Sequence, residues 1–174
     1  IKHTIRVYIR KKPGHCLAIR NGHRFNHVGQ RKSIHIHHDR QQNTVIFGKN
    51  ATEAINKLAH RLPHGDDCVI LTTRLEHHSN DLPWRDHYRV VHVGNRPDGR
   101  LDEEDFDTKL REYEGRIALV AVTGAANVTG YLLPVHRLAG KAHDAGTRIL
   151  VDAAQLAPHR RIDMKPHDDP GHLD

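Results

Sequence analysis

The chain has 174 residues, of which 37% are hydrophobic and 28% are charged, a composition compatible with one soluble globular core. Its two cysteines, Cys16 and Cys68, exclude a disulfide framework, and no apolar run approaches the length that spans a bilayer. We therefore expect a cytoplasmic protein without membrane association. The sequence begins at Ile1 and ends in a turn-like stretch at residues 168–174, so we expect a part of a longer protein.

The net charge of +6 is concentrated in the first 42 residues, which hold 10 Lys or Arg and one acid. Residues 43–174 hold 17 Lys or Arg and 20 acids. The first segment also contains seven of the 18 histidines and lacks a sustained helical period. We expect short strands at residues 1–9 and 33–37, where polar and apolar residues alternate, and coil elsewhere.

Three interpretations of this basic, His-rich segment stay open. Clustered Lys and Arg could bind nucleic acid, although one Tyr and one Phe offer little base stacking. A metal site could be built from four residues whose spacing matches no common zinc pattern: His35, His37, His38 and Asp39. We favour a segment of uncertain structure whose composition cannot build a core. Nucleic-acid binding is accordingly not expected, and no metal is assigned.

From residue 43 onward, apolar runs alternate with amphipathic segments. Strands are predicted at residues 44–47, 68–72, 88–93, 117–123 and 148–152, and helices at 51–62, 102–112 and 134–145. The first helix has one apolar face, formed by Ala51, Ala54, Ile55, Leu58, Ala59 and Leu62. Strands and helices that alternate with short loops predict an α/β fold in three layers, with a mostly parallel sheet and helices on both faces.

Polar residues follow four of these strands. The helix that starts near Thr52 offers free N–H groups to an anion, although Asn50 or Thr52 could equally serve only as its cap. His77 follows the second strand, and Asn127 follows the strand at 117–123. Asp152 and Gln155 follow the strand at 148–152, where they could instead cap the next turn. Since ligands bind at the carboxyl ends of such strands, we expect one site along this edge.

Four segments, in this order, resemble a known family: N-A-T-E-A-I-N, E-H-H-S-N-D-L-P-W, A-N-V-T-G and V-D-A-A-Q. They are similar to the class V aminotransferase fold of pyridoxal-phosphate enzymes, and most similar to its cysteine desulfurase and selenocysteine lyase group. The resemblance covers roughly residues 43–174, whereas residues 1–42 do not resemble the family's amino-terminal region. It implies an incomplete large domain of a pyridoxal-phosphate-dependent transferase at residues 43–174.

The resemblance also implies roles for individual residues. Ala51 and Thr52 would hold the phosphate of pyridoxal phosphate through backbone and hydroxyl. Asn127 and Gln155 would lie near its phenolic oxygen.

Three further residues would contact the cofactor ring. Asp152 would pair with the protonated pyridine nitrogen and keep the ring an electron sink for a substrate carbanion. His77 would stack on one face of the ring and assist proton transfers, which makes it the candidate catalytic residue. Ala154 would lie against the opposite face.

The chain departs from the family pattern at Gly124, where desulfurases commonly carry a His, and at Ala126 and Thr129. The family's Schiff-base lysine is expected beyond Asp174, because Lys165 lacks its sequence context. We therefore expect a full-length homodimeric transferase or lyase that acts on an amino acid, and an inactive 174-residue chain. The alternative is a non-enzymatic protein that binds nucleic acid or metal through residues 1–42.

Overall fold

The computed structural model describes residues 8–11, 15–18, 36–37, 44–45, 48–63 and 65–174. Its centre is a sheet of four parallel strands: β5 (Val69–Thr73), β6 (Arg89–Val93), β7 (Ile117–Thr123) and β8 (Ile149–Asp152). The strand order is β6-β5-β7-β8, and Thr123 at the end of β7 pairs with Asp152 at the end of β8. The carboxyl ends of these two strands therefore lie side by side.

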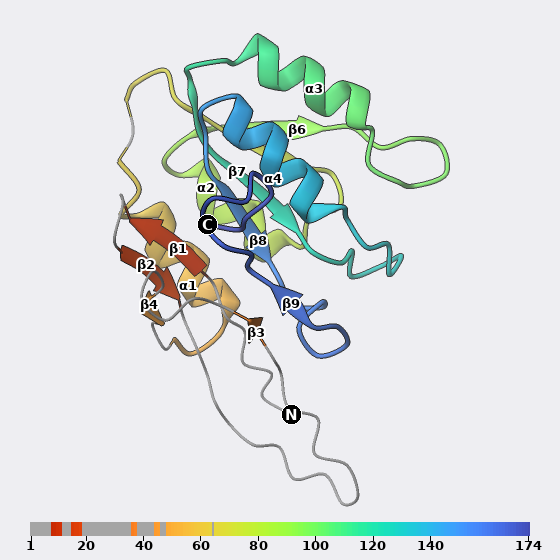
Figure 1. The fold of residues 1–174 in the computed structure, drawn as a ribbon. Coiled ribbons are helices and arrows are strands. Elements are labelled where there is room, and N and C mark those ends of the chain that lie inside the picture. The colour runs from red at the N-terminus through yellow and green to blue at the C-terminus, as the bar shows by residue number, and fades with distance from the viewer. Residues whose placement is uncertain (1–7, 12–14, 19–35, 38–43, 46–47, 64) are drawn as a thin grey trace, which may run out of the picture.

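Helices cover both faces of this sheet, which confirms the predicted three-layer α/β fold (Figure 1). On one face α1 (Ala51–Ala59) and α2 (Leu82–Arg85) pack on strand residues that include Ile70 and Leu150. On the other face α3 (Glu103–Glu112) and α4 (Val135–Asp144) pack on alternate residues such as Leu71 and Ile149. Helices on both faces of the sheet explain why β7, one of its central strands, is apolar from Ile117 to Val122.

Helix α1 forms within residues 51–62, the segment in which the apolar face predicted a helix. The side chain of Asn50 caps the helix by accepting a hydrogen bond from Glu53 N at 2.8 Å. All six residues of the predicted apolar face are buried, including Leu62, which lies past the end of the helix. Asn50, rather than Thr52, is therefore the cap.

Helix α4 ends at Asp144, and a glycine follows its last turn. Gly146 has a φ of 73°, and its N–H donates to His143 O while that of Thr147 donates to Ala142 O. A residue with a left-handed backbone conformation commonly ends a helix, and glycine adopts this conformation without steric cost.

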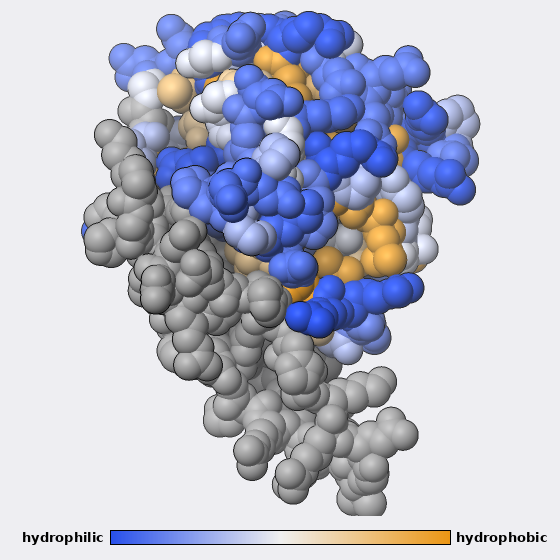
Figure 2. All heavy atoms as spheres, viewed as in Figure 1, coloured by the Kyte–Doolittle hydropathy of each residue, from blue (hydrophilic) through white to orange (hydrophobic). Residues whose placement is uncertain are grey.

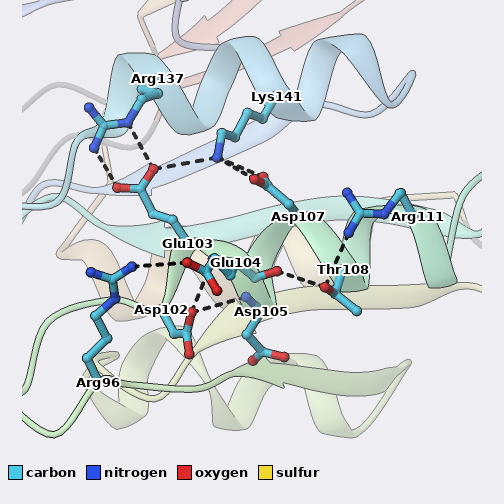
Figure 3. A network of polar contacts seen from close by, with 10 residues as sticks. All are labelled: Arg96, Asp102, Glu103, Glu104, Asp105, Asp107, Thr108, Arg111, Arg137 and Lys141. Carbon is cyan, nitrogen blue, oxygen red and sulfur yellow. Dashed lines mark hydrogen bonds and ion pairs between the residues drawn. The ribbon is translucent and has the colours of Figure 1, made fainter.

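Salt bridges join α4 to α3 at the surface (Figure 3). Arg137 Nε donates to Glu103 at 2.9 Å, and Lys141 Nζ lies 2.7 Å from Asp107. Figure 2 shows a largely hydrophilic surface over these helices. Pairs of this kind contribute about 1 kcal/mol or less each, so the apolar contacts beneath them hold the two helices.

The strand predicted at residues 44–47 does not join the main sheet. Its described part is β4 (Thr44–Val45), which pairs in parallel with β2 (His15–Ala18), itself antiparallel to β1 (Tyr8–Lys11). The expectation that α1 follows a strand of the main sheet is therefore wrong. An apolar run predicts a strand, but partner choice depends on pairing that the run does not encode.

Two other expectations for the amino-terminal segment need correction. Strand β2 lies where coil was predicted, and β1 extends past the predicted end at residue 9, while residues 1–7 lie outside the described part. Of the strand predicted at 33–37, the structure describes β3 (Ile36–His37), which pairs with β9 (Ile162–Asp163). The candidate metal-site residues His35, His38 and Asp39 lie outside the described residues.

None of the helices described in the structure is long and apolar enough to cross a bilayer.

A histidine of α4 fixes the segment that follows β9. His143 Nδ1 contacts Pro170 O at 2.8 Å, and its Nε2 lies 2.8 Å from Asp174 Oδ2. The same carboxylate oxygen accepts Ile149 N at the start of β8 at 3.0 Å. The hydrogen bond with Asp174 raises the pKa of His143. Since a carbonyl can only accept, Nδ1 carries a proton, and the charged imidazole satisfies both contacts.

We expect His143→Gln to destabilise the protein more in acid than in alkali. Because the pKa of His143 is raised in the folded protein, its contribution to stability is complete below the ordinary pKa of 6.5. It is lost as the pH rises through the folded-state pKa. The unfolding free energy should fall by about 1 kcal/mol near pH 5.5 and by clearly less near pH 9, measured by urea unfolding. His159→Gln at an exposed position is the control. An equal loss at both pH values would contradict the ion pair.

Candidate functional site

Asp152 is the centre of the candidate site. It ends β8, and only 3% of its surface is exposed. Ala154 N donates to Oδ1 at 3.0 Å, whereas Oδ2 has no hydrogen-bond partner among the described residues. Burial raises the pKa of Asp152, and this effect exceeds the opposing effects of the Ala154 hydrogen bond and the charge of His77. A buried carboxylate oxygen without a donor is costly unless a ligand supplies one.

The charge of His77 lowers the pKa of Asp152, so the two side chains lie within electrostatic range, although no hydrogen bond joins them in the described structure. Its side chain is exposed and begins the short 3-10 helix η1 (His78–Asn80). Nδ1 accepts the N–H of Ser79 at 3.2 Å and lies 2.8 Å from Ser79 Oγ. Because Nδ1 accepts a backbone N–H, the neutral ring carries its proton on Nε2. One ring edge is thus fixed while the other can exchange protons.

Glu76 belongs to the same site and was not singled out from the sequence. Thr73 Oγ1 and Thr123 N donate to its Oε1 at 2.6 and 2.8 Å, and Asn80 Nδ2 donates to its Oε2 at 2.7 Å. Burial raises the pKa of Glu76 to about 7 against these hydrogen bonds, with a further increase from Asp152. The sequence signal that could have indicated Glu76 is its position immediately before His77 and four residues before Asn80. Asn80 proves to be fully buried.

The predicted phosphate-binding residues start α1, a helix that contacts η1. Ala51 is buried and Thr52 is exposed. In the described part of the chain, the backbone N–H groups of both residues and the Thr52 hydroxyl make no hydrogen bond. Because the Asn50 side chain caps the helix through Glu53 N, it leaves the donors of Ala51 and Thr52 available to an anion.

The remaining predicted residues are less closely associated with Asp152. Asn127 lies on an exposed turn between β7 and α4, and Gln155 is exposed in the turn after β8. Within the described residues, neither side chain makes a hydrogen bond to His77 or Asp152. Ala154 is half-buried and contacts Asp152 through its backbone N–H. The structure thus joins Ala154 to Asp152, whereas the side chains of Asn127 and Gln155 are exposed to solvent.

Gly124 leaves no room for a side chain. A Cβ at this position would lie 2.8 Å from Leu156 Cδ2 and 3.3 Å from Val151 Cγ1. A side chain at this position therefore requires Leu156 to move.

We expect Gly124→Ala to lower the unfolding free energy by about 1–3 kcal/mol, the usual cost of overpacking. The double variant Gly124→Ala/Leu156→Ala should remove this clash, so the glycine substitution should cost less in the Leu156→Ala background. Denaturant unfolding of the four proteins measures the coupling. Equal costs in both backgrounds would contradict this packing.

One group of side chains in the described part brings possible metal-ligand atoms near one another: those of His143, His172 and Asp174 lie within 4.8 Å of one another. The two imidazole rings are stacked, with centroids 4.2 Å apart and planes 20° apart. Because each nitrogen lone pair lies in the plane of its ring, two stacked rings do not direct their lone pairs at one ion. This geometry favours the protonated His143–Asp174 pair described above.

Comparison with known proteins assigns the chain to a family. The family model for aminotransferase class V matches residues 27–168, so the chain belongs to this family. It is 33% identical over 129 residues to a probable cysteine desulfurase of Mycobacterium leprae, and 36% identical over 141 residues to a cysteine desulfurase of Enterobacter. These alignments cover 69% and 74% of this chain, but 31% and 33% of the relatives.

A solved structure shows the same fold. The cysteine desulfurase from Thermococcus onnurineus superimposes with a TM-score of 0.60 at 31% identity, over 72% of this chain and 31% of that one. The resemblance to class V enzymes is confirmed, and the family match begins within the basic segment, at residue 27. The chain spans about a third of the length of the relatives it matches.

Proposed function

We propose that this chain forms part of the pyridoxal-phosphate site of an enzyme that acts on an amino acid. The observation that carries the proposal is the Asp152 carboxylate, which is buried with Oδ2 lacking a donor in the described structure. The protonated nitrogen of a pyridine ring supplies both the missing hydrogen bond and a compensating charge. The residues present therefore fit the cofactor.

Each part of the cofactor has a partner in this assignment. Asp152 binds the ring nitrogen, and the N–H groups of Ala51 and Thr52, with the Thr52 hydroxyl, bind the phosphate. His77 would lie on one face of the ring and Ala154 on the other. Asn127 and Gln155 would bind at the phenolic oxygen.

The chemistry of these residues is proton transfer and charge stabilisation. When bound, pyridoxal phosphate supplies an electron sink for a carbanion at the substrate. Asp152 holds a proton at the ring nitrogen, which maintains that sink. His77 carries an exchangeable proton on Nε2 and can move it at the open face of the site.

The relatives support a cysteine desulfurase-like reaction, with cysteine or a related amino acid as substrate. We further propose a homodimer in the cytoplasm, with residues 43–174 as the partial cofactor-binding domain and residues 1–42 as a basic, His-rich segment. The completing lysine stays a prediction outside these 174 residues. Metal or nucleic-acid binding by residues 1–42 has no supporting observation in the described residues.

We expect added pyridoxal phosphate to quench the fluorescence of Trp84 in a saturable way. Trp84 is the only tryptophan, is fully buried, and donates from Nε1 to Asn80 O at 3.0 Å, next to the site. Pyridoxal without the phosphate should bind at least about tenfold more weakly, because it forfeits the contacts at the start of α1. Quenching that rises linearly without saturation would contradict the proposed function.

A further inference from the structure

We infer that Glu76 is a positioning residue that fixes His77 relative to Asp152 by joining the ends of β5 and β7 to the turn that carries His77. This inference rests on the proposed function. The three hydrogen bonds of Glu76 come from three separate segments: Thr73 in β5, Thr123 in β7 and Asn80 in η1. His77 is the residue between this carboxylate and η1, so the turn cannot move without breaking one of these bonds.

The strand pairing extends this connection to Asp152. Thr123 is held in place by two contacts. It pairs with Asp152 in the sheet, and its hydroxyl donates to Ala125 O at 2.8 Å. Gly124 N also donates to Asp152 O at 2.9 Å. Glu76 is thus bonded to the residue beside Asp152 on one side and precedes His77 on the other. It touches neither the substrate nor the cofactor in this assignment.

A second connection leads from Glu76 into the core. Asn80, fully buried, donates to Glu76 and accepts through its backbone O from Trp84 Nε1 at 3.0 Å. Trp84 is also fully buried, so the turn is anchored to the layer formed by α1 and α2. A change at Glu76 should therefore alter Trp84 emission, which gives a measure of the turn that does not require any cofactor.

The test compares Glu76→Gln and Glu76→Ala with Glu114→Gln, an exposed control. Gln keeps the shape and, if the Asn80 amide flips, three hydrogen bonds, at the cost of the 3.4 Å hydrogen bond from Trp84 Nε1 to Asn80 Oδ1. Ala leaves the three donors without an acceptor. Three readouts are taken in the intact 174-residue chain below its melting temperature. They are Trp84 emission without cofactor, the dissociation constant of pyridoxal phosphate, and the circular dichroism of the bound cofactor.

A positioning role predicts that Glu76→Ala weakens pyridoxal phosphate binding about tenfold or more and diminishes its induced circular dichroism, while Glu76→Gln stays within about threefold of the wild type. If Ala fails to fold, Glu76→Gln carries the test through Trp84 emission, whose change between about pH 5.5 and 8.5 it should diminish. Asp152 is the charged group that acts on Glu76 in this titration.

Two outcomes would overturn the inference: a folded Glu76→Ala protein with wild-type affinity and circular dichroism, or a Glu76→Gln protein with wild-type pH dependence of Trp84 emission. If the wild type binds no pyridoxal phosphate, the proposed function fails. The emission readout then still decides whether Glu76 holds the turn.

Discussion

Replacing Asp152 by Asn is expected to weaken pyridoxal phosphate binding and, at the same time, to stabilise the protein without cofactor. The Asn side chain can still accept the hydrogen bond from Ala154 N, but it cannot balance the charge of a pyridinium nitrogen. Removing one partner of a buried charged pair costs about 2 kcal/mol or more, which corresponds to about 30-fold or more in the dissociation constant.

The stabilising half of this prediction follows from the same burial. Asp152 is 3% exposed with Oδ2 lacking a donor in the described structure, so its ionised form opposes folding. The neutral amide removes this cost, and we expect the unfolding free energy near pH 8 to rise by about 1–3 kcal/mol. Asp66→Asn, an exposed position, is the matched control. A variant that loses both stability and affinity would show only a damaged fold.

The unfolding free energy of the wild type should fall as the pH rises from about 5 to about 8. The pKa of Glu76 is raised from its ordinary value of 4.5 to about 7, so the folded protein binds a proton that the unfolded chain has released. The contribution of Glu76 to the unfolding free energy is complete below about pH 4.5 and is lost as the pH rises through about 7. The raised pKa of Asp152 and that of His143 act in the same direction.

Glu76→Gln separates the contribution of Glu76 from the other two. A shift from 4.5 to about 7 corresponds to at most about 3 kcal/mol between the two pH extremes. The variant should lose that part of the pH dependence, with Glu114→Gln unchanged, as measured by urea unfolding across the range. A wild-type slope in Glu76→Gln would show that Glu76 has an ordinary pKa.

The central fold could be predicted because its signals are local. Continuous apolar strands such as 117–123, and a helix whose apolar face begins at Ala51, reflect burial that each segment requires by itself. The position of Asp152 followed from the same logic, since a polar residue at the end of a parallel strand lies at the ligand-binding edge.

Other features depend on contacts between distant segments. The pairing of Thr44–Val45 with β2 instead of the main sheet is set by partner availability, which no local pattern records. The role of Glu76 depends on Thr123, 47 residues away, so the sequence around Glu76 contains its two local donors but does not indicate this third one. The close contact of Gly124 with Leu156 likewise arises only after β7 and β8 pair.

The most direct test of the account is the protonation state of the ring nitrogen of bound pyridoxal phosphate, read from the nuclear magnetic resonance shift of isotopically labelled ring nitrogen. With the wild-type chain at neutral pH, we predict a protonated nitrogen that becomes unprotonated or unbound in Asp152→Asn. A nitrogen that is unprotonated in the wild type, or equally protonated in both proteins, would contradict the assignment of Asp152.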